Sequence, residues 1–127
     1  MNKTNAMRQL EQEGIPFRVH EYDAADGLVD AVTVAGKIAL PPEQCFKTLV
    51  TCGADHNHYV FVIPGSTELN LKKAARAANC KSMRLIPLKG LLPLTGYIHG
   101  GCSPIGMKKE LPTFIDETAI LYETVGV

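Results

Sequence analysis

The sequence has no excess of charge of either sign, because its 127 residues include 13 lysines and arginines and 13 aspartates and glutamates. A protein without net charge creates no general field that attracts polyanions. This balance excludes a protein that binds duplex nucleic acid over its whole surface, so any contact with nucleic acid must come from a local patch. The length fits one domain, residues 1–127, with one hydrophobic core.

The sequence also lacks a Cys-x-x-Cys pair, although it contains Cys45, Cys52, Cys80 and Cys102. It has no apolar leader and no apolar run long enough to span a membrane. Secreted proteins of this size often carry paired cysteines behind such a leader. We therefore expect a cytoplasmic protein with reduced thiols and no contact with a membrane.

Ligands at the spacing of a structural zinc site are lacking as well. His56, His58 and Cys52 are the nearest approach to such a group. The two histidines straddle a predicted turn, however, and no second cluster follows at a suitable spacing. We expect neither a metal ion nor another cofactor.

Hydrophobic periodicity predicts an α+β (mixed α/β) fold. Helices are predicted for a segment capped by Thr4 and ending near Gly14, for about Asp30–Ala39 with Val32, Ala35 and Ala39 inward, and for Leu71–Ala78 capped by Asn70. Strands are predicted for Phe17–Tyr22, Cys45–Cys52, His58–Ile63, Ser82–Ile86, Tyr97–His99, Thr113–Asp116 and Ile120–Val125, with residues 88–94 as a turn. Turn residues at 53–57 pair the second and third strands as a hairpin. We expect a mixed, mostly antiparallel and partly barrel-like central sheet flanked by helices.

Lys47 stands out because it lies in the strand Cys45–Cys52, whose two faces are both largely apolar. Burial of an ammonium group in such a strand is costly. Lys47 therefore either reaches water at the mouth of the strand, or is held in a pocket for a functional reason. Spacing alone favours the first explanation.

A second unusual segment is Thr95–Gly106, where a short apolar stretch runs into a loop that contains Gly100, Gly101, Pro104 and Gly106. Glycines adopt positive φ and let a ligand approach the main chain, whose N–H groups can converge on an oxygen atom. A tight turn explains the same composition equally well.

Several short sequence motifs, taken together, are more specific than either segment alone. They are Phe46-Lys47-Thr48-Leu49-Val50, Leu69-Asn70-Leu71-Lys72-Lys73-Ala74, Thr95-Gly96-Tyr97 with Gly100-Gly101, and Ser103-Pro104-Ile105-Gly106. With these motifs, and with Lys3-Thr4-Asn5-Ala6-Met7-Arg8 near the start, the chain resembles the YbaK/EbsC family of aminoacyl-tRNA editing domains from residue 3 to its last residue. Within that family it is most similar to the Cys-tRNA(Pro) deacylases.

The resemblance implies a YbaK-like fold and a hydrolase that serves translation fidelity by cleaving mischarged tRNA, most of all Cys-tRNA(Pro). The family's lysine matches Lys47, which is implied to hold the aminoacyl-adenosine end and is our candidate catalytic residue. The family's loop matches Gly100 and Gly101, which would enclose that end, and Tyr22 would lie beside the substrate. The remaining substrate-binding residues implied in this way are Thr48, Ser103, Pro104 and Gly106.

Neither obvious nucleophile in the second segment is convincing. Ser103 is followed by Pro104, which has no N–H to offer to an oxyanion at the position where serine hydrolases of the Gly-x-Ser-x-Gly type need one. Cys102 has only His99 nearby as a base, at a spacing that is not a known signature, and a buried structural cysteine is the simpler interpretation. In the similar cysteinyl-specific enzymes the thiol of the substrate attacks its own carbonyl, so the enzyme supplies no nucleophile.

The partners implied by the resemblance are the acceptor end of mischarged tRNA(Pro) and prolyl-tRNA synthetase. Phosphate contacts are one explanation for the basic residues Lys72, Lys73, Arg76, Lys81 and Arg84, and a solvated helix face is the other. Two alternatives to the leading function stay open: a module that binds aminoacyl-adenosine or a nucleotide without turnover, and a deacylase for alanyl or seryl substrates.

The chain differs from the family pattern at its end. Family members continue into a Ser-x-Gly-x-x-Gly-like segment and a helix, whereas this sequence stops at Val125-Gly126-Val127. We expect the 127 residues to be a shortened form whose pocket lacks part of one wall. The predicted terminal strand Ile120–Val125 carries few charged residues that would protect it from edge pairing, which favours the same interpretation.

Overall fold

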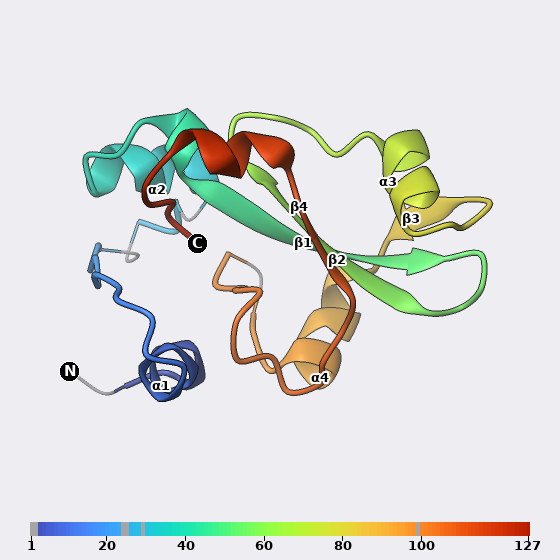
Figure 1. Cartoon of the computed structure of the whole chain (residues 1–127), viewed down its shortest axis with the longest axis horizontal. Coiled ribbons are helices and arrows are strands. Elements are labelled where there is room, and N and C mark those ends of the chain that lie inside the picture. Colours follow the sequence, from blue (N-terminus) through green and yellow to red (C-terminus); the bar gives the residue numbers. More distant parts are fainter. Residues whose placement is uncertain (1–2, 24–25, 29, 99) are drawn as a thin grey trace.

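The computed structural model describes residues 3–23, 26–28, 30–98 and 100–127 (Figure 1). Its helices are α1 (Asn5–Gln12), α2 (Ala31–Lys37), α3 (Leu71–Ala77) and α4 (Leu91–Thr95), and its strands are β1 (Phe46–Gly53), β2 (His58–Pro64), β3 (Met83–Leu85) and β4 (Thr113–Ile115). Short 3-10 helices cover Pro42–Gln44, Leu88–Gly90 and Glu117–Leu121. None of the described helices has the length and apolar character needed to cross a membrane.

The four strands form one sheet in the order β3-β1-β2-β4. β1 and β2 pair as the predicted antiparallel hairpin, with Phe46 opposite Pro64 and Cys52 opposite His58. β3 pairs antiparallel with β1, and β4 pairs parallel with β2. The predicted mixed and mostly antiparallel sheet is confirmed, but it is open, because β3 and β4 are its two edges rather than partners that close a barrel.

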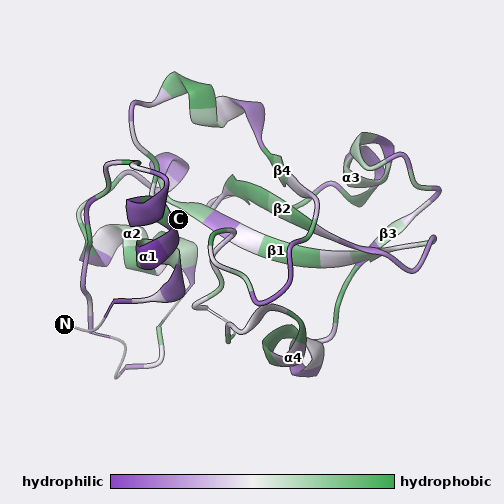
Figure 2. Cartoon of the chain, turned by 60° about the horizontal axis from the view of Figure 1, so that its bottom comes forward, coloured by the Kyte–Doolittle hydropathy of each residue, from purple (hydrophilic) through white to green (hydrophobic). Residues whose placement is uncertain are grey.

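Each face of the sheet carries its own hydrophobic cluster. On one face, Phe46 and Val50 pack with Val60 and Val62 and with Leu91 of α4. On the other, Phe61 and Met83 pack with Ala74 and Ala75 of α3. Figure 2 shows α4 and α3 on opposite sides of the strands. We call these sides the α4 face and the α3 face; even-numbered residues of β1 point to the α4 face and odd-numbered ones to the α3 face.

Local capping signals placed the helices well. The side chains of Thr4 and Asn70 accept hydrogen bonds from the backbone N–H of Met7 and Lys73, as expected for N-caps. α1 nevertheless buries no residue fully, because it packs against a loop and not against the sheet.

The second helix is shorter than predicted. α2 ends at Lys37, and Ala39, which was expected inside it, adopts a left-handed φ of 58°. Its buried residues are Val34 and Ala35. The inward position of Ala35 was therefore predicted correctly, whereas Val32, which is 43% exposed, and Ala39, which is also exposed, were not.

Four other predictions were wrong. Phe17–Tyr22 is exposed and joins no strand, and Tyr97 and Ile98 join none either, while His99 lies outside the described residues. Residues 88–94, predicted as a turn, form a 3-10 helix followed by most of α4. In place of the strand Ile120–Val125 there is the 3-10 helix Glu117–Leu121, which begins where the Asp116 carboxylate accepts a hydrogen bond from Thr118 N at 2.9 Å. Ile120 is 87% exposed on this helix, so its apolar side chain is not a sign of a buried strand.

Candidate functional site

The loop that follows α4, residues 96–107, holds five of the candidate site residues, and we call it the glycine loop. Its ends are tied together, because Lys108 N donates to Thr95 O at 2.8 Å. The hydroxyl of Thr95, which is 1% exposed, donates to Leu91 O at 2.8 Å and accepts from Tyr97 N at 3.0 Å. Gly96 ends α4 in the left-handed conformation, with φ 82°. The segment is therefore a compact loop with a fixed neck, of the kind that often carries function.

The second half of the glycine loop is braced from two sides. The Tyr97 hydroxyl donates to Ile105 O at 2.6 Å, and Ile105 N donates to Ser103 Oγ at 3.2 Å. From α1, Gln9 Oε1 accepts a hydrogen bond from Gly106 N at 2.8 Å. The Ile105 carbonyl and the amide N–H groups of Ile105 and Gly106 therefore have little freedom to move.

Gly106 has a structural reason to be glycine. Its φ is +72°, and a Cβ atom there would lie 2.7 Å from Ala6 N, inside α1. Gly106 was predicted to bind substrate, and the structure places it against the helix. Its close approach to α1 is what allows the helix to support the loop.

Gly100 and Gly101 differ from Gly106 in this respect. Both are exposed. The nearest atom to a Cβ built on Gly101 is Ile98 Cγ1 at 3.6 Å, an ordinary contact, so the fold itself has room for a side chain there. Gly101 N already donates to Ile98 O at 3.0 Å, so this particular N–H is not free to bind an oxyanion. The bare backbone at Gly101 leaves space at the surface of the loop that the fold does not use.

Thr48 lies on the α4 face of β1, between Phe46 and Val50, which pack in the same cluster as Cys102 and Met107 of the glycine loop. Its Oγ1 atom is buried and has no hydrogen-bond partner, and no other buried side-chain nitrogen or oxygen of the described residues is left in that state. Buried hydroxyl groups are nearly always paired, because losing water without a replacement costs about 1–3 kcal/mol. An unpaired hydroxyl beneath the loop is therefore a candidate ligand contact.

The outer edge of β1 is open beside Thr48. β3 pairs with the last three residues of β1, 51–53. Beyond β3, two backbone hydrogen bonds reach the same edge of β1: Ile86 N donates to Val50 O at 3.2 Å, and Phe46 N donates to Gly126 O at 2.7 Å. Even-numbered residues of β1 direct their backbone N–H and C=O groups to this edge. Between these two contacts, no described residue forms a backbone hydrogen bond with Thr48. An open strand edge can hydrogen-bond an incoming ligand.

Lys47, the neighbour of Thr48, projects from the α3 face, opposite Ile63 of β2. It is half-buried, and no hydrogen bond or ion pair joins its ammonium to another residue that the structure describes. Lys47 and Thr48 thus point to different faces, and the open edge of β1 is where one ligand could contact both. This position fits both explanations given above for Lys47, an ammonium that reaches water at the mouth of the strand and an ammonium held in a pocket.

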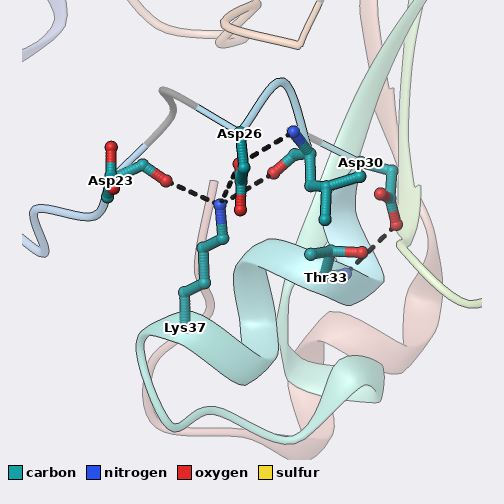
Figure 3. A network of polar contacts seen from close by, with 6 residues as sticks. Asp23, Asp26, Asp30, Thr33 and Lys37 are labelled. Atoms are coloured by element: carbon teal, nitrogen blue, oxygen red, sulfur yellow. Dashed lines mark hydrogen bonds and ion pairs between the residues drawn. The ribbon is translucent and has the colours of Figure 1, made fainter.

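Tyr22 lies beside Lys37, a lysine that sequence reasoning missed. Lys37 Nζ is 5.8 Å from the centre of the Tyr22 ring. It donates to Asp23 O at 2.6 Å, to Asp26 Oδ1 at 2.9 Å and to Leu28 O at 3.1 Å (Figure 3). The hydrogen bond from Lys37 lowers the pKa of Asp26. Lys37 thereby fixes the backbone that follows Tyr22, and only its place in the last turn of a helix, where a cation is favoured, marked it in the sequence.

The candidate nucleophilic side chains of the glycine loop are not activated. Burial raises the pKa of the Cys102 thiol, which disfavours the thiolate. Ser103 Oγ already accepts a hydrogen bond from Ile105 N, and His99 lies outside the described residues. Among the described residues no group of three or more histidine, cysteine, aspartate or glutamate side chains is arranged to hold a metal ion.

Comparison with known proteins gives consistent matches. Residues 25–127 match the model of the aminoacyl-tRNA editing domain family. A protein of Enterococcus faecalis named as a Cys-tRNA(Pro)/Cys-tRNA(Cys) deacylase, EbsC, is 45% identical over 125 residues, which are 98% of this chain and 76% of that protein. A solved structure named as a trans-editing enzyme for prolyl-tRNA synthetase is 29% identical, with a TM-score of 0.81 over 98% of this chain and 80% of that one. The crystal structure of hypothetical protein APE2540, at 20% identity and a TM-score of 0.83 over 96% of this chain and 79% of that one, adds a likeness of fold alone.

Proposed function

The chain belongs to the aminoacyl-tRNA editing domain family, whose members are hydrolases of aminoacyl-tRNA, and we propose that it acts in trans on mischarged tRNA, most of all on Cys-tRNA(Pro). The name of the Enterococcus faecalis relative supports this substrate. A structural relative named for prolyl-tRNA synthetase supports prolyl-tRNA synthetase as a partner and the cytoplasm as the place of action.

The observation that carries the proposal is the buried and unpaired Thr48 hydroxyl, at an open strand edge and on the face covered by the glycine loop. In the proposed complex the aminoacyl-ribose ester lies along this edge. Thr48 then gains the hydrogen-bond partner it lacks, and Lys47 brings its ammonium to the ester from the other face. The exposed backbone of Gly100 and Gly101 covers the ligand from above, while Ser103, Pro104 and Tyr22 complete the enclosure.

The proposed reaction needs orientation and charge more than an enzyme nucleophile. The thiol sulfur of the cysteinyl group attacks its own carbonyl carbon, the ester bond to the ribose breaks, and the thiol proton passes to the ribose oxygen. Water then opens the resulting cyclic thioester and releases cysteine. The Lys47 ammonium stabilises the negative charge that develops on the carbonyl oxygen, and the bound geometry supplies the remaining acceleration. Cys102 and Ser103 have no covalent role.

A deacylation assay tests this function directly. The protein is mixed with tRNA(Pro) charged with cysteine, alanine or serine, and release of the amino acid is followed with the parent chain and with Lys47→Ala. We expect cysteinyl-tRNA to be hydrolysed fastest, and the variant to stay folded but lose most of its activity. Lys47→Arg should also fail, because a planar guanidinium does not replace a compact ammonium.

Two outcomes would redirect the proposal. Preference for alanyl- or seryl-tRNA would change the substrate but keep the reaction. No hydrolysis of any of the three, together with measurable binding of an aminoacyl-adenosine analogue, would establish the alternative of a binding module without turnover.

A further inference from the structure

A cleft lies between α1 and the segment that leaves the glycine loop. Its volume is about 1010 Å³. One wall is formed by Asn5, Arg8, Gln9, Gln12 and Glu13, and the other by Pro104 and residues 106–113. The hydrogen bond between Gln9 and Gly106 joins the two walls, so the cleft is part of the fold and not a chance gap between mobile segments.

Cations stand on both walls of the cleft. Arg8 lies on the α1 wall, and Lys108 and Lys109 lie on the other. All three are exposed, and none forms an ion pair with a residue that the structure describes. Arg8 Nη1 is held by Asn5 Oδ1 at 3.1 Å, which directs the guanidinium without neutralising it. Two carboxylates, Glu13 and Glu110, also line the cleft, so the cations are in slight excess.

The cleft continues directly from the candidate site. Pro104 and Gly106 belong both to the glycine loop and to the cleft wall, and Lys108 N closes the neck of that loop at Thr95 O. A polymer whose reactive end lies at the glycine loop would reach Lys108 and Lys109 within the next few units. A polyanionic strand is the partner that unpaired cations on two facing walls fit.

The other basic surface of the chain is less well placed. Lys72, Lys73 and Arg76 lie on α3, which packs on the α3 face of the sheet, whereas the glycine loop packs on the α4 face. A strand that left the glycine loop would have to pass around the sheet to reach α3. The cleft needs no such detour.

We propose that the α1 cleft binds the sugar-phosphate backbone of the substrate RNA next to its aminoacyl end, with Arg8, Lys108 and Lys109 contacting phosphates. This inference rests on the proposed function for the position of the reactive end. It names a binding surface that neither the charge balance nor the family resemblance locates.

The test measures binding of uncharged tRNA(Pro), labelled with a fluorophore, by anisotropy at salt concentrations between 50 and 200 mM. The double variant Lys108→Gln/Lys109→Gln removes two contacts and is expected to weaken binding about tenfold or more at low salt. It should also reduce the slope of log K against log salt by about 1.5. Lys72→Gln/Lys73→Gln is the matched control, with the same loss of charge on the opposite face, and should leave both quantities unchanged. Glu110→Gln should tighten binding.

The outcomes separate this inference from the proposed function, since uncharged tRNA requires no turnover. Weaker binding and a lower salt slope in the cleft variant alone support it. A larger effect of the α3 variant, or no effect of either, overturns it. A parent chain that binds as expected but hydrolyses no ester would overturn the deacylase function while leaving the RNA surface established.

Discussion

Gln9 Oε1 on α1 accepts a hydrogen bond from Gly106 N at 2.8 Å, across 97 residues of sequence. This contact and the close approach of Gly106 to Ala6 and Asn5 attach α1, a helix that buries no residue fully, to the glycine loop. The relationship runs in both directions. α1 is held in place by the glycine loop, and the loop is held in one conformation by α1.

Gln9→Leu is expected to loosen the glycine loop. The variant leaves the Gly106 N–H without its acceptor, at a cost of about 1 kcal/mol. Amide hydrogen exchange should therefore accelerate at Ile105 and Gly106 and along α1, and kcat should fall several-fold with less change in KM. Gln9→Glu keeps an acceptor oxygen and should restore the slow exchange.

Gln12→Leu serves as the control, since Gln12 lies on the same helix and lines the same cleft but makes no hydrogen bond to the described residues of the loop. Equal exchange rates in Gln9→Leu and Gln12→Leu would show that Gln9 does not position the loop.

Two glycines of the same loop should respond in opposite ways to valine. At position 101 an added Cβ meets no described atom closer than 3.6 Å, so Gly101→Val should change the free energy of unfolding little. Deacylation should be lost, because the side chain occupies the space proposed for the ligand. Gly106→Val places a Cβ 2.7 Å from Ala6 N at a φ of +72°, and the backbone conformation alone costs about 1–3 kcal/mol. Urea denaturation and the deacylation assay together measure the contrast. Full activity in Gly101→Val would remove these glycines from the substrate site.

Acid stability is expected to depend on Asp55 at the β1–β2 turn. The Tyr59 hydroxyl donates to Asp55 Oδ2 at 2.6 Å, and Asn57 N donates to Asp55 Oδ1 at 3.0 Å. The hydrogen bond from Tyr59 is the largest cause that lowers the pKa of Asp55 to about 2. Because the folded pKa is below the ordinary value of 3.8, this carboxylate contributes stability above about pH 4 and loses it as the pH falls towards 2.

Urea midpoints measured from pH 7 to pH 2 check this dependence. The parent should lose stability between pH 4 and pH 2, and Asp55→Asn should start lower and show a flatter curve in that window. Parallel curves for the two proteins would show that Asp55 is not the group responsible.

The parts of the fold that the sequence predicts are those whose cause is local. The turn residues at 53–57 select the β1–β2 hairpin, and Thr4 and Asn70 cap helices through their own side chains. The strand predicted at Phe17–Tyr22 fails because alternation describes a residue pattern but cannot supply a neighbouring strand. At Ile120 the apolar pattern predicted a strand, but the Asp116 side chain caps a 3-10 helix that includes this residue.

The candidate site divides in the same way. Lys47 and the glycines became candidates because each breaks a local rule: Lys47 is a charge in an apolar strand, and the glycines form a stretch with little side chain. The unpaired state of Thr48 Oγ1 and the contact between Gln9 and Gly106 depend on residues distant in sequence, so no local pattern reports them. Lys37 was missed for that reason, since its acceptors lie 9 to 14 residues away in an irregular loop.

Thr48→Val is expected to stabilise the protein and to reduce its activity. Valine has nearly the same shape as threonine but removes the buried hydroxyl that has no partner, so the free energy of unfolding should rise by about 1 kcal/mol. If that hydroxyl is kept for the substrate, the same change should lower kcat/KM. An increase in stability with a loss of turnover is the behaviour of a residue retained for function at a cost to the fold.

Thr51→Val on the same strand is the matched control. Thr51 is fully buried, and its hydroxyl donates to Tyr59 O at 2.9 Å, so its removal breaks a satisfied hydrogen bond. This variant should lose about 1 kcal/mol of stability and keep its kcat/KM. The two threonines, three positions apart, should therefore move stability in opposite directions, as measured by urea denaturation at pH 7. If Thr48→Val destabilises the protein as Thr51→Val does, the Thr48 hydroxyl has a partner within the fold, and the substrate contact proposed for it is wrong.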